Sequence, residues 1–316
     1  MVQEALGKKV EAAGIEKQVA TLTNELLLKG ESLEKAVDNE HDMKKIKQLF
    51  REIAGCWFYK SPIVKMAYDK PRGYPGDFEL FEIIYNNESV AENNTIAFYC
   101  DRYFLNNDYA KAARARKNKM KNVLQDLMEN SDLSTIKMMN VACGPSREIR
   151  ELFSEPALLS EISGKNIIFT GLDYDKDSIK FSKAALSNLP SNIETRFLNE
   201  NVLSISRNPK YYDLIGKQDI IYILGLTEYL PDRIFKKLLH FLFQLLNNKG
   251  MLVVTYKDKD IVFPSLPPEW FCDWDFIKRG KDDLIAAAKE LGEGNHSLKI
   301  EREGTGTIFF LTVTKI

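Results

Sequence analysis

Residues 138–148 read MMNVACGPSRE, and they join a predicted buried strand to a predicted helix through a tight turn of small residues. The first N–H groups of a helix have no partners within the helix, and the helix dipole favours negative charge beside them. Ala142, Gly144 and Ser146 are small enough to let a ligand approach the main chain. A dinucleotide-binding turn carries three glycines and this one carries a single glycine, so a plain connection without a ligand is the alternative interpretation.

A second predicted strand, residues 166–173, reads NIIFTGLD and ends in an acid. In a βαβ unit this places the Asp173 carboxylate beside the first turn, where it can accept hydrogen bonds from the two hydroxyls of a ribose. Asp173 could instead cap the helix predicted from about Lys176, a role for which Asp175 competes. Taken together with the preceding turn, ribose binding is the prediction for Asp173.

Strands and helices continue to alternate toward the end of the chain. A helix with a long apolar face, from about Ile234 to Leu246, is expected to stop at residues 247–250, Asn-Asn-Lys-Gly, which is favourable C-cap chemistry. The last two strands have a turn and no helix between them, so they should pair as a hairpin. This pattern predicts an α/β fold with a parallel, doubly wound sheet. The further strands are predicted at residues 193–198, 219–224, 251–256, 297–301 and 307–313.

The first 125 residues lack this alternation and are predicted to be helical throughout, which divides the chain into a helical domain of residues 1–125 and an α/β domain of residues 126–316. Residues 71–76 hold two glycines and two prolines, which predicts an irregular loop of fixed shape. A basic stretch at residues 109–121 is expected to be a solvated helix face, with Arg114 or Arg116 as alternatives for meeting an acidic substrate. Two apolar stripes with helical spacing are expected to form a helix-bundle core: Ile15, Val19, Leu22, Leu26 and Leu28, and Ile46, Leu49, Phe50, Ile53 and Trp57.

The bulk composition argues against several function classes. A net charge of −1 over 316 residues does not fit a protein that binds nucleic acid through phosphate contacts. The four cysteines are widely scattered and there are only three histidines, so we expect reduced thiols and no metal site. No apolar run reaches membrane-spanning length, and the opening residues Met1–Glu4 do not begin a signal-peptide core, so we expect a cytoplasmic protein without a membrane partner.

Seven strands in this order, with a small-residue turn after the first and an acid after the second, resemble the class I S-adenosylmethionine-dependent methyltransferases. The resemblance covers residues 126–316 and implies a Rossmann-like seven-stranded sheet with a C-terminal antiparallel hairpin, preceded by an N-terminal helical cap. It implies S-adenosylmethionine as the cofactor, bound across the carboxyl ends of the first strands. Asn140 stands where the family often has an acid, and the glycine-rich turn is reduced to Gly144.

Carried over position by position, the resemblance implies a set of cofactor-binding residues. The methionine portion would lie against the first turn, with Asn140 at its amino acid end, and Asp173 would hold the ribose. Tyr174 would lie near the adenine, and Asn201 would replace the acid that commonly meets the adenine amine. The full set is Asn140, Ala142, Cys143, Gly144, Asp173, Tyr174, Asn201, Val202, Leu224 and Gly225, the last two beside the sulfonium.

A more specific resemblance lies in residues 70–77, KPRGYPGD, together with residues 142–145, 225–230 and 269–274. These segments are similar to bacterial proteins of the 3-hydroxypalmitate methyl ester biosynthesis type, an RGYxGD subgroup. Some relatives resemble natural-product tailoring enzymes. The same fold includes azetidine-2-carboxylate synthases, which cyclise S-adenosylmethionine and release methylthioadenosine.

A methyl-transferring enzyme has to align its acceptor, exclude water and, where needed, remove a proton. A carboxylate acceptor needs no base but does need a cation, for which Arg72 is the candidate unless Arg72 pairs with Asp77 to brace its loop. Asp273 or Glu228 could act as a base for a hydroxyl or amine. Residues 270–274 could form a lid, or could pack between the C-terminal segment and the helical domain. Aromatic rings attract a sulfonium, and the candidates are Tyr74, Tyr229, Trp270 and Trp274, of which Tyr74 and Tyr229 are also taken as catalytic.

The sequence therefore predicts an S-adenosylmethionine-dependent methyltransferase acting on a carboxylate or hydroxyl oxygen of a small metabolite or fatty acid, with the helical cap supplying much of the acceptor site. Two alternatives stay open. Cyclisation of S-adenosylmethionine requires a deprotonated amine, with which the neutral Asn140 is compatible. A regulatory protein that binds the cofactor without chemistry is the other alternative.

Overall fold

The computed structural model describes residues 12–208, 210–292 and 294–316, so the opening residues Met1–Glu4 lie outside the described part. The chain forms two compact units. One is helical and contains the residues up to Arg114 together with residues 261–276, and the other is an α/β unit of residues 115–260 and 277–316. The division falls inside helix α7 (Asp108–Asn130), before the boundary predicted at residue 125, and residues 261–276 return to the helical unit.

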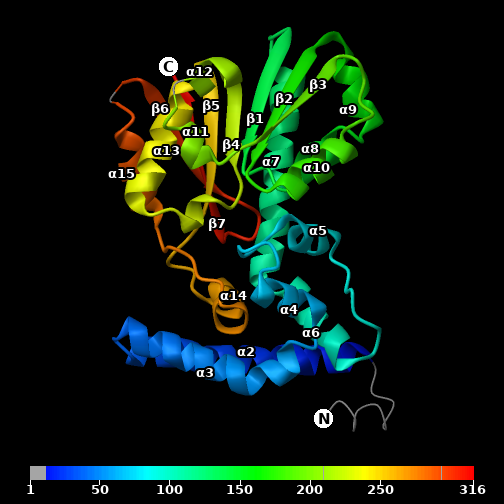
Figure 1. Cartoon of the computed structure of the whole chain (residues 1–316), viewed down its shortest axis with the longest axis vertical. Helices are drawn as coiled ribbons and strands as arrows, with labels where there is room; N and C mark the ends of the chain where they lie inside the picture. Colours follow the sequence, from blue (N-terminus) through cyan, green and yellow to red (C-terminus); the bar gives the residue numbers. More distant parts are fainter. Residues whose placement is uncertain (1–11, 209, 293) are drawn as a thin grey trace. The chain divides into compact units, whose positions relative to one another are not determined.

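The α/β unit is built on a seven-stranded sheet with the order β3-β2-β1-β4-β5-β7-β6 (Figure 1). The first five strands are parallel, and β7 is antiparallel to both β5 and β6, which confirms the predicted α/β sheet with its terminal hairpin. The strand order reverses between β1 and β4, and ligands of open α/β sheets bind at the carboxyl ends of strands at such a point. The strands are β1 (Thr135–Val141), β2 (Asn166–Asp173), β3 (Ile193–Asn199), β4 (Gln218–Ile223), β5 (Leu246–Lys257), β6 (His296–Arg302) and β7 (Ile308–Lys315).

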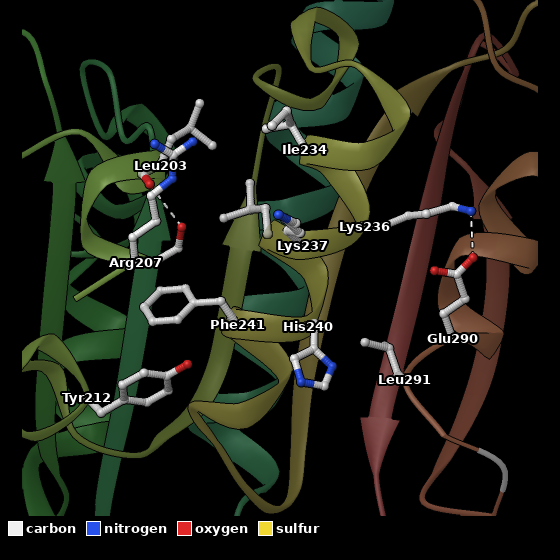
Figure 2. Close-up of a pocket in the computed structure, with 12 residues that line it drawn as sticks. Leu203, Arg207, Tyr212, Ile234, Lys236, Lys237, His240, Phe241, Glu290 and Leu291 are labelled. Atoms are coloured by element: carbon white, nitrogen blue, oxygen red, sulfur yellow. Dashed lines mark hydrogen bonds and ion pairs between the residues drawn. The ribbon is translucent and has the colours of Figure 1, made fainter. Parts of the chain in front are cut away.

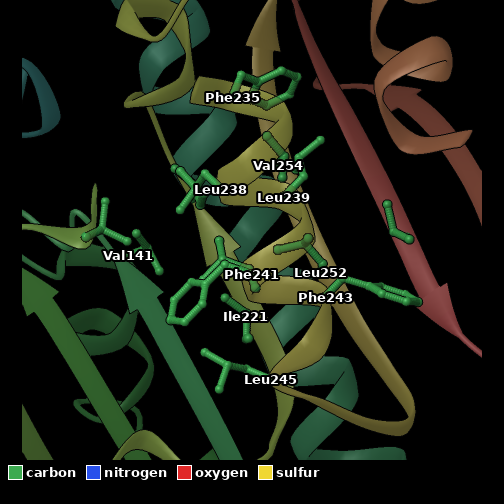
Figure 3. Packing of buried hydrophobic residues seen from close by; sticks show 14 of the residues in the cluster. Val141, Ile221, Phe235, Leu238, Leu239, Phe241, Phe243, Leu245, Leu252 and Val254 are labelled. Atoms are coloured by element: carbon green, nitrogen blue, oxygen red, sulfur yellow. The ribbon is translucent and has the colours of Figure 1, made fainter. Parts of the chain in front are cut away.

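Side chains that alternate along the strands fill two hydrophobic cores, one on each face of the sheet. Met139 and Ile221 face one core, where they pack with α13 and α15, and Figure 3 shows the residues of α13 against this face. Met138 and Ile220 face the other core with α7 and α8. The helices and 3₁₀ turns of this unit are α8 (Arg147–Leu152), α9 (Pro156–Glu161), η1 (Ile162–Gly164), α10 (Lys176–Ala185), α11 (Val202–Ile205), α12 (Lys210–Ile215), η2 (Thr227–Tyr229), α13 (Asp232–Gln244) and α15 (Lys281–Lys289).

The end of α13 differs from the prediction. The helix stops at Gln244 with Leu245 as its C-cap, and β5 already starts at Leu246. Both leucines are buried in the core that α13 shares with the sheet, so tertiary packing ends the helix before the polar residues are reached. The residue of this segment with left-handed φ is Lys249, at 63°, which lies inside β5, and not Gly250.

The helical unit is organised around α14 (Leu266–Cys272), in which every residue is buried. This short helix contacts α2, α3 and α4, although it starts nearly two hundred residues after the end of α4. Residues 70–77 form an irregular loop with positive φ at Gly73 and Gly76, as the glycine and proline content predicted. The other helices of this unit are α2 (Ala12–Ala36), α3 (Glu40–Phe58), α4 (Pro62–Asp69), α5 (Phe78–Asn86), α6 (Ile96–Asn106) and η3 (Phe263–Ser265).

The prediction that both apolar stripes form a bundle core is wrong for much of each stripe. On α3, Leu49, Ile53 and Trp57 are exposed, at 55%, 67% and 59%. On α2, Leu22, Leu26 and Leu28 are exposed as well, while Ile15 is buried. The reason is geometric: α6 and α14 cover one side of α2 and α3, and each apolar stripe extends beyond the side that these helices cover.

Candidate functional site

Side chains of α10 bond the main chain of the turn after β1, which contains three residues with positive φ. These are Ala142 at 56°, Gly144 at 51° and Ser146 at 47°, and Ser146 precedes the first residue of α8. The hydroxyls of Ser178 and Ser182 on α10 donate to the Gly144 carbonyl oxygen at 2.8 and 2.9 Å. A Cβ added at Gly144 would meet no atom within 4 Å, so space is open beside the main chain of this turn.

Asp173 ties this turn to the end of β2. One carboxylate oxygen accepts from the Gly144 N–H at 2.9 Å, and the other accepts from the Asp175 N–H at 2.9 Å. Asp175, not Asp173, caps α10, since it accepts from the main-chain N–H groups of Asp177 and Ser178. The Asp173 side chain is buried, which raises its pKa, although the two main-chain hydrogen bonds oppose that shift. A carboxylate has about four acceptor positions, so capacity for further donors remains.

The residues predicted for the adenine end lie where β2 and β3 finish. Asn199 donates its side-chain amide to the carbonyl oxygens of Asp173 and Tyr174, which joins the two strand ends. Tyr174 is exposed, at 54%. Asn201 accepts from the Leu203 N–H and caps α11, and the next residue, Val202, is buried. The structure therefore brings the predicted residues of the first turn, β2 and β3 to the same edge of the sheet.

A buried acid lies under the first turn, and the sequence did not predict it. Glu148, in the first turn of α8, is 3% exposed. Its Oε1 atom accepts from Asn140 Nδ2 at 2.8 Å and from the Tyr222 hydroxyl at 2.7 Å. Burial raises the pKa of Glu148, and the hydrogen bond from Tyr222 opposes that shift. Asn140 is 1% exposed, and its Oδ1 atom accepts no hydrogen bond from the described residues.

A second buried charge cluster lies at the end of β4. Gly225 has φ of 97°, and a Cβ there would lie 2.9 Å from Nη1 of Arg116 on α7. Arg116 Nη1 lies 3.7 Å from Glu228 Oε1, and both side chains are almost fully buried. Burial raises the pKa of Glu228, and nearby Arg116 opposes that shift. Glu228 Oε2 is buried with no hydrogen-bond partner among the described residues. The half-buried Leu224 follows the last residue of β4.

These contacts correct the prediction of a solvated basic helix face. Arg116 is 2% exposed and Lys117 is 7% exposed. Lys117 Nζ pairs with Glu151 of α8 at 2.5 Å, and Lys121 pairs with Glu155 at 2.8 Å. Arg116, Lys117 and Lys121 of α7 therefore meet acids of their own unit. Spacing along the helix could not reveal this, because the acids lie in other elements.

Arg279 holds the loop that carries Glu228, a role that was not predicted from the sequence. Its guanidinium donates to the carbonyl oxygens of Thr227 and Leu230, at 3.1 and 2.5 Å. It also donates to the Tyr256 hydroxyl at 2.7 Å and to Asp232. The predicted residue Tyr229 lies in η2 inside this loop and is half-buried.

The predicted acceptor residues lie in the helical unit. Arg72 pairs with Glu79 at 2.8 Å and lies over the Phe78 ring, while Asp77 caps α5. Asp273 has φ of 50° and pairs with Arg51 at 2.8 Å. The half-buried Tyr74 lies in the same loop as Arg72.

The two tryptophans of residues 270–274 are both 3% exposed. Trp270 donates to Glu34 at 2.8 Å, and Trp274 packs edge-on to Phe81 and Tyr109. Both rings therefore belong to the core of the helical unit. This corresponds to the packing alternative for this segment and not to an exposed lid face.

A surface hollow of about 440 Å³ lies over α11, α13 and α15 (Figure 2). Phe241 and Tyr212 line one part of it, and the Lys236–Glu290 ion pair borders another. None of the predicted site residues lines this hollow. It is therefore separate from the strand ends where those residues gather.

Two further findings concern the described residues. No helix in residues 12–208, 210–292 and 294–316 has both the length and the apolar character that crossing a membrane requires. Within the same ranges, no group of three or more His, Cys, Asp or Glu side chains could hold a metal ion.

Comparisons with known proteins bear on the fold. No model of a protein family matches the sequence, and no curated protein matches it. A possible exported protein from Bordetella parapertussis is 15% identical over 76% of this chain and 79% of that chain, with a TM-score of 0.54. The CMeT domain of the citrinin polyketide synthase is 12% identical over 85% of this chain and 64% of that chain, with a TM-score of 0.52. The magnesium protoporphyrin IX methyltransferase of Synechocystis PCC 6803, crystallised with bound SAH, is 13% identical over 66% of this chain and 88% of that chain, with a TM-score of 0.48.

The likeness to the first two structures is a likeness of fold. The mixed seven-stranded sheet with helices on both faces is the Rossmann-like methyltransferase fold, and a helical region precedes it in the chain.

Proposed function

We propose that the α/β unit binds S-adenosylmethionine at the carboxyl ends of β1, β2 and β4, and that the protein transfers the methyl group to a small-molecule acceptor. The observation that carries this proposal is the Asp173 carboxylate, which bonds the Gly144 N–H of the first turn beside open space. The fold supports it, because this edge of the sheet is where such folds bind ligands.

The residues present fit this cofactor. Gly144 lets a ligand approach the main chain, and Asp173 keeps acceptor positions for the two ribose hydroxyls. Asn140 Oδ1 is a buried acceptor that lacks a donor among the described residues. S-adenosylmethionine, when bound, supplies a methyl group made electrophilic by a positively charged sulfur. The chain's residues have to hold the cofactor, exclude water and take up a proton where the acceptor has one.

Glu228 is the residue that we propose takes up this proton. Its Oε2 atom is buried and lacks a partner among the described residues, and burial raises the pKa of its carboxyl toward the range useful for a base. Arg116 lies 3.7 Å from the other oxygen and holds the carboxylate in place. Of the two oxygen acceptors predicted, we favour a hydroxyl, because a carboxylate needs no base and would be repelled by Glu228.

Arg72, predicted to place a carboxylate acceptor, is instead paired with Glu79, which supports the same choice. The 3-hydroxypalmitate-type subgroup, a natural-product substrate and a part for the helical unit in acceptor recognition stay predictions from the sequence.

The proposal is tested first by binding. Purified protein should bind S-adenosylhomocysteine, measured by isothermal titration calorimetry, and Asp173→Asn should weaken this binding by about tenfold or more, the cost of a lost charge-assisted hydrogen bond. Asp175→Asn is the matched control, because it makes the same aspartate-to-asparagine change at the N-cap of α10, where asparagine is an equally good cap. Absence of binding, or equal effects of the two variants, would contradict the cofactor site.

The reaction is tested by incubating the protein with S-adenosylmethionine and panels of hydroxyl-, carboxylate- and amine-bearing metabolites, with products analysed by mass spectrometry. S-adenosylhomocysteine formed only with an acceptor supports methyl transfer. Methylthioadenosine formed from S-adenosylmethionine alone would contradict methyl transfer and support cyclisation. Binding without any turnover would favour the regulatory alternative.

A further inference from the structure

The buried acid under the first turn has a geometry that points to a ligand. Glu148 Oε1 accepts from Asn140 Nδ2 on β1 at 2.8 Å and from the Tyr222 hydroxyl on β4 at 2.7 Å. A carboxylate oxygen can only accept when ionised, so it selects the donating end of the Asn140 amide. The orientation of the amide is thereby set, and Oδ1 becomes the end that is left for another partner.

Asn140 Oδ1 has no donor among the described residues, although the side chain is 1% exposed. Buried polar atoms without partners are rare in proteins because their desolvation is uncompensated. The Asn140 side chain lies one residue before the end of β1, immediately before the turn with the open space at Gly144. A donor brought by a ligand would satisfy it.

We propose that Asn140 Oδ1 accepts a hydrogen bond from the ammonium group of the amino acid portion of the ligand, and that Glu148 is a positioning residue that orients Asn140 and supplies the negative charge behind it. This inference rests on the proposed function, because it concerns the same ligand site. The resembled family often has an acid on β1 where Asn140 stands, and here the negative charge comes from Glu148 of α8. The acid missing at residue 140 is replaced by one in the next helix.

Because Glu148 titrates, its proposed role in orienting Asn140 and supplying charge predicts a pH dependence of ligand affinity that a purely structural role would not. The titratable groups that face it are Tyr222 of β4, Lys117 of α7, Glu151 of α8 and Cys143 of the turn. Burial raises the pKa of Glu148, which favours the protonated acid in the ligand-free protein. A bound ammonium group favours the ionised acid. Affinity for an amino-bearing ligand should therefore rise as pH rises through the titration of Glu148.

The test compares two ligands that share the adenosine portion. S-adenosylhomocysteine carries the amino acid portion, and 5′-methylthioadenosine lacks it, and both are titrated calorimetrically from acidic to mildly alkaline pH. For Asn140→Ala we expect S-adenosylhomocysteine to bind about tenfold to hundredfold more weakly, with methylthioadenosine changed by less than about twofold. For Glu148→Gln, which can still accept both hydrogen bonds, we expect about a tenfold loss for S-adenosylhomocysteine and loss of its pH dependence.

Glu155→Gln is the matched control, because it makes the same change in an acid that pairs with Lys121 and not with Asn140. It should leave the affinity ratio of the two ligands unchanged. Equal losses for both ligands in the Asn140 and Glu148 variants, or a pH dependence that persists in Glu148→Gln, would overturn the inference and leave the cofactor site standing. Failure of the wild-type protein to bind either ligand would overturn the proposed function and this inference together.

Discussion

Two glycines near the proposed cofactor site should respond very differently to the same substitution. Gly144 and Gly225 both have positive φ, at 51° and 97°, so an alanine at either position is strained by about 1–2 kcal/mol. Their surroundings differ. A Cβ at Gly144 would meet nothing within 4 Å, whereas a Cβ at Gly225 would lie 2.9 Å from Arg116 Nη1 and 3.2 Å from Nη2.

The added cost at Gly225 comes from the buried ion pair. Arg116 is 2% exposed, so its guanidinium cannot swing into water and must move relative to Glu228, its partner at 3.7 Å. Breaking a buried pair costs about 3–5 kcal/mol, and a partial displacement costs part of that. We therefore expect Gly225→Ala to lower the free energy of unfolding by about 3 kcal/mol or more, against about 1–2 kcal/mol for Gly144→Ala.

The assay is urea-induced unfolding followed by far-ultraviolet circular dichroism, with S-adenosylhomocysteine binding measured in parallel. Gly144→Ala places its methyl group in the open space beside the turn, so it should lose affinity while remaining the more stable of the two. Gly304→Ala is the control, since a Cβ there also meets nothing within 4 Å and its φ is not positive. Equal destabilisation by the changes at Gly144 and Gly225 would refute the argument that the Arg116 contact matters.

Three further predictions use other groups. Asp173→Asn should lower the free energy of unfolding by about 1.5–3 kcal/mol in urea titrations, because the carboxylate accepts two main-chain hydrogen bonds; an effect no larger than that of Asp175→Asn would contradict this. The folded protein holds a proton on Glu148 more tightly than the unfolded chain does, since burial raises that pKa, so the free energy of unfolding should fall as pH rises above the ordinary carboxylate range. Glu148→Gln should flatten this slope in unfolding measurements at several pH values, and an unchanged slope would assign it to other groups. A thiol reagent should modify one cysteine rapidly in the native protein, and Cys56→Ser should abolish that fast phase, because only Cys56 is exposed among the described cysteines. Burial raises the pKa of Cys100 to about 11 and that of Cys272 to about 12, so a second fast thiol would contradict the structure.

Most strands could be predicted from the sequence to within a few residues, but β5 starts at Leu246, five residues before its predicted start at residue 251. The apolar, β-branched runs of β1, β2, β4, β5 and β7 are largely buried on both faces of the sheet, and such runs stand out from the helices between them. The sequence left two candidates for the N-cap of α10, Asp173 and Asp175, because both precede the helix at suitable spacing. The structure resolves it through the Gly144 N–H, which belongs to a different strand connection.

What escaped prediction depends on partners that are distant in the sequence. Arg116 and Glu228, and Glu148 and Tyr222, meet only because the sheet and its helices bring them together. The apolar stripes failed for the opposite reason, because periodicity reveals an apolar face but not whether another element covers it. Leu49 is exposed although its spacing is that of a core residue.

The return of α14 to the helical unit has a consequence for the way in which the protein is made. The ribosome synthesises α2, α3 and α4 before β1 to β5. The helix that these three contact, α14, is synthesised only after β5. During that interval the nascent helical unit lacks the segment around which it packs, and apolar surface stays open to other chains. The α/β unit is also incomplete during synthesis, because β7 lies between β5 and β6 in the sheet and is synthesised after both of them. The helical unit therefore stays incomplete until α14 has been synthesised, and the α/β unit stays incomplete until β7 has been synthesised. Exposed apolar surface makes such partly folded chains prone to aggregation.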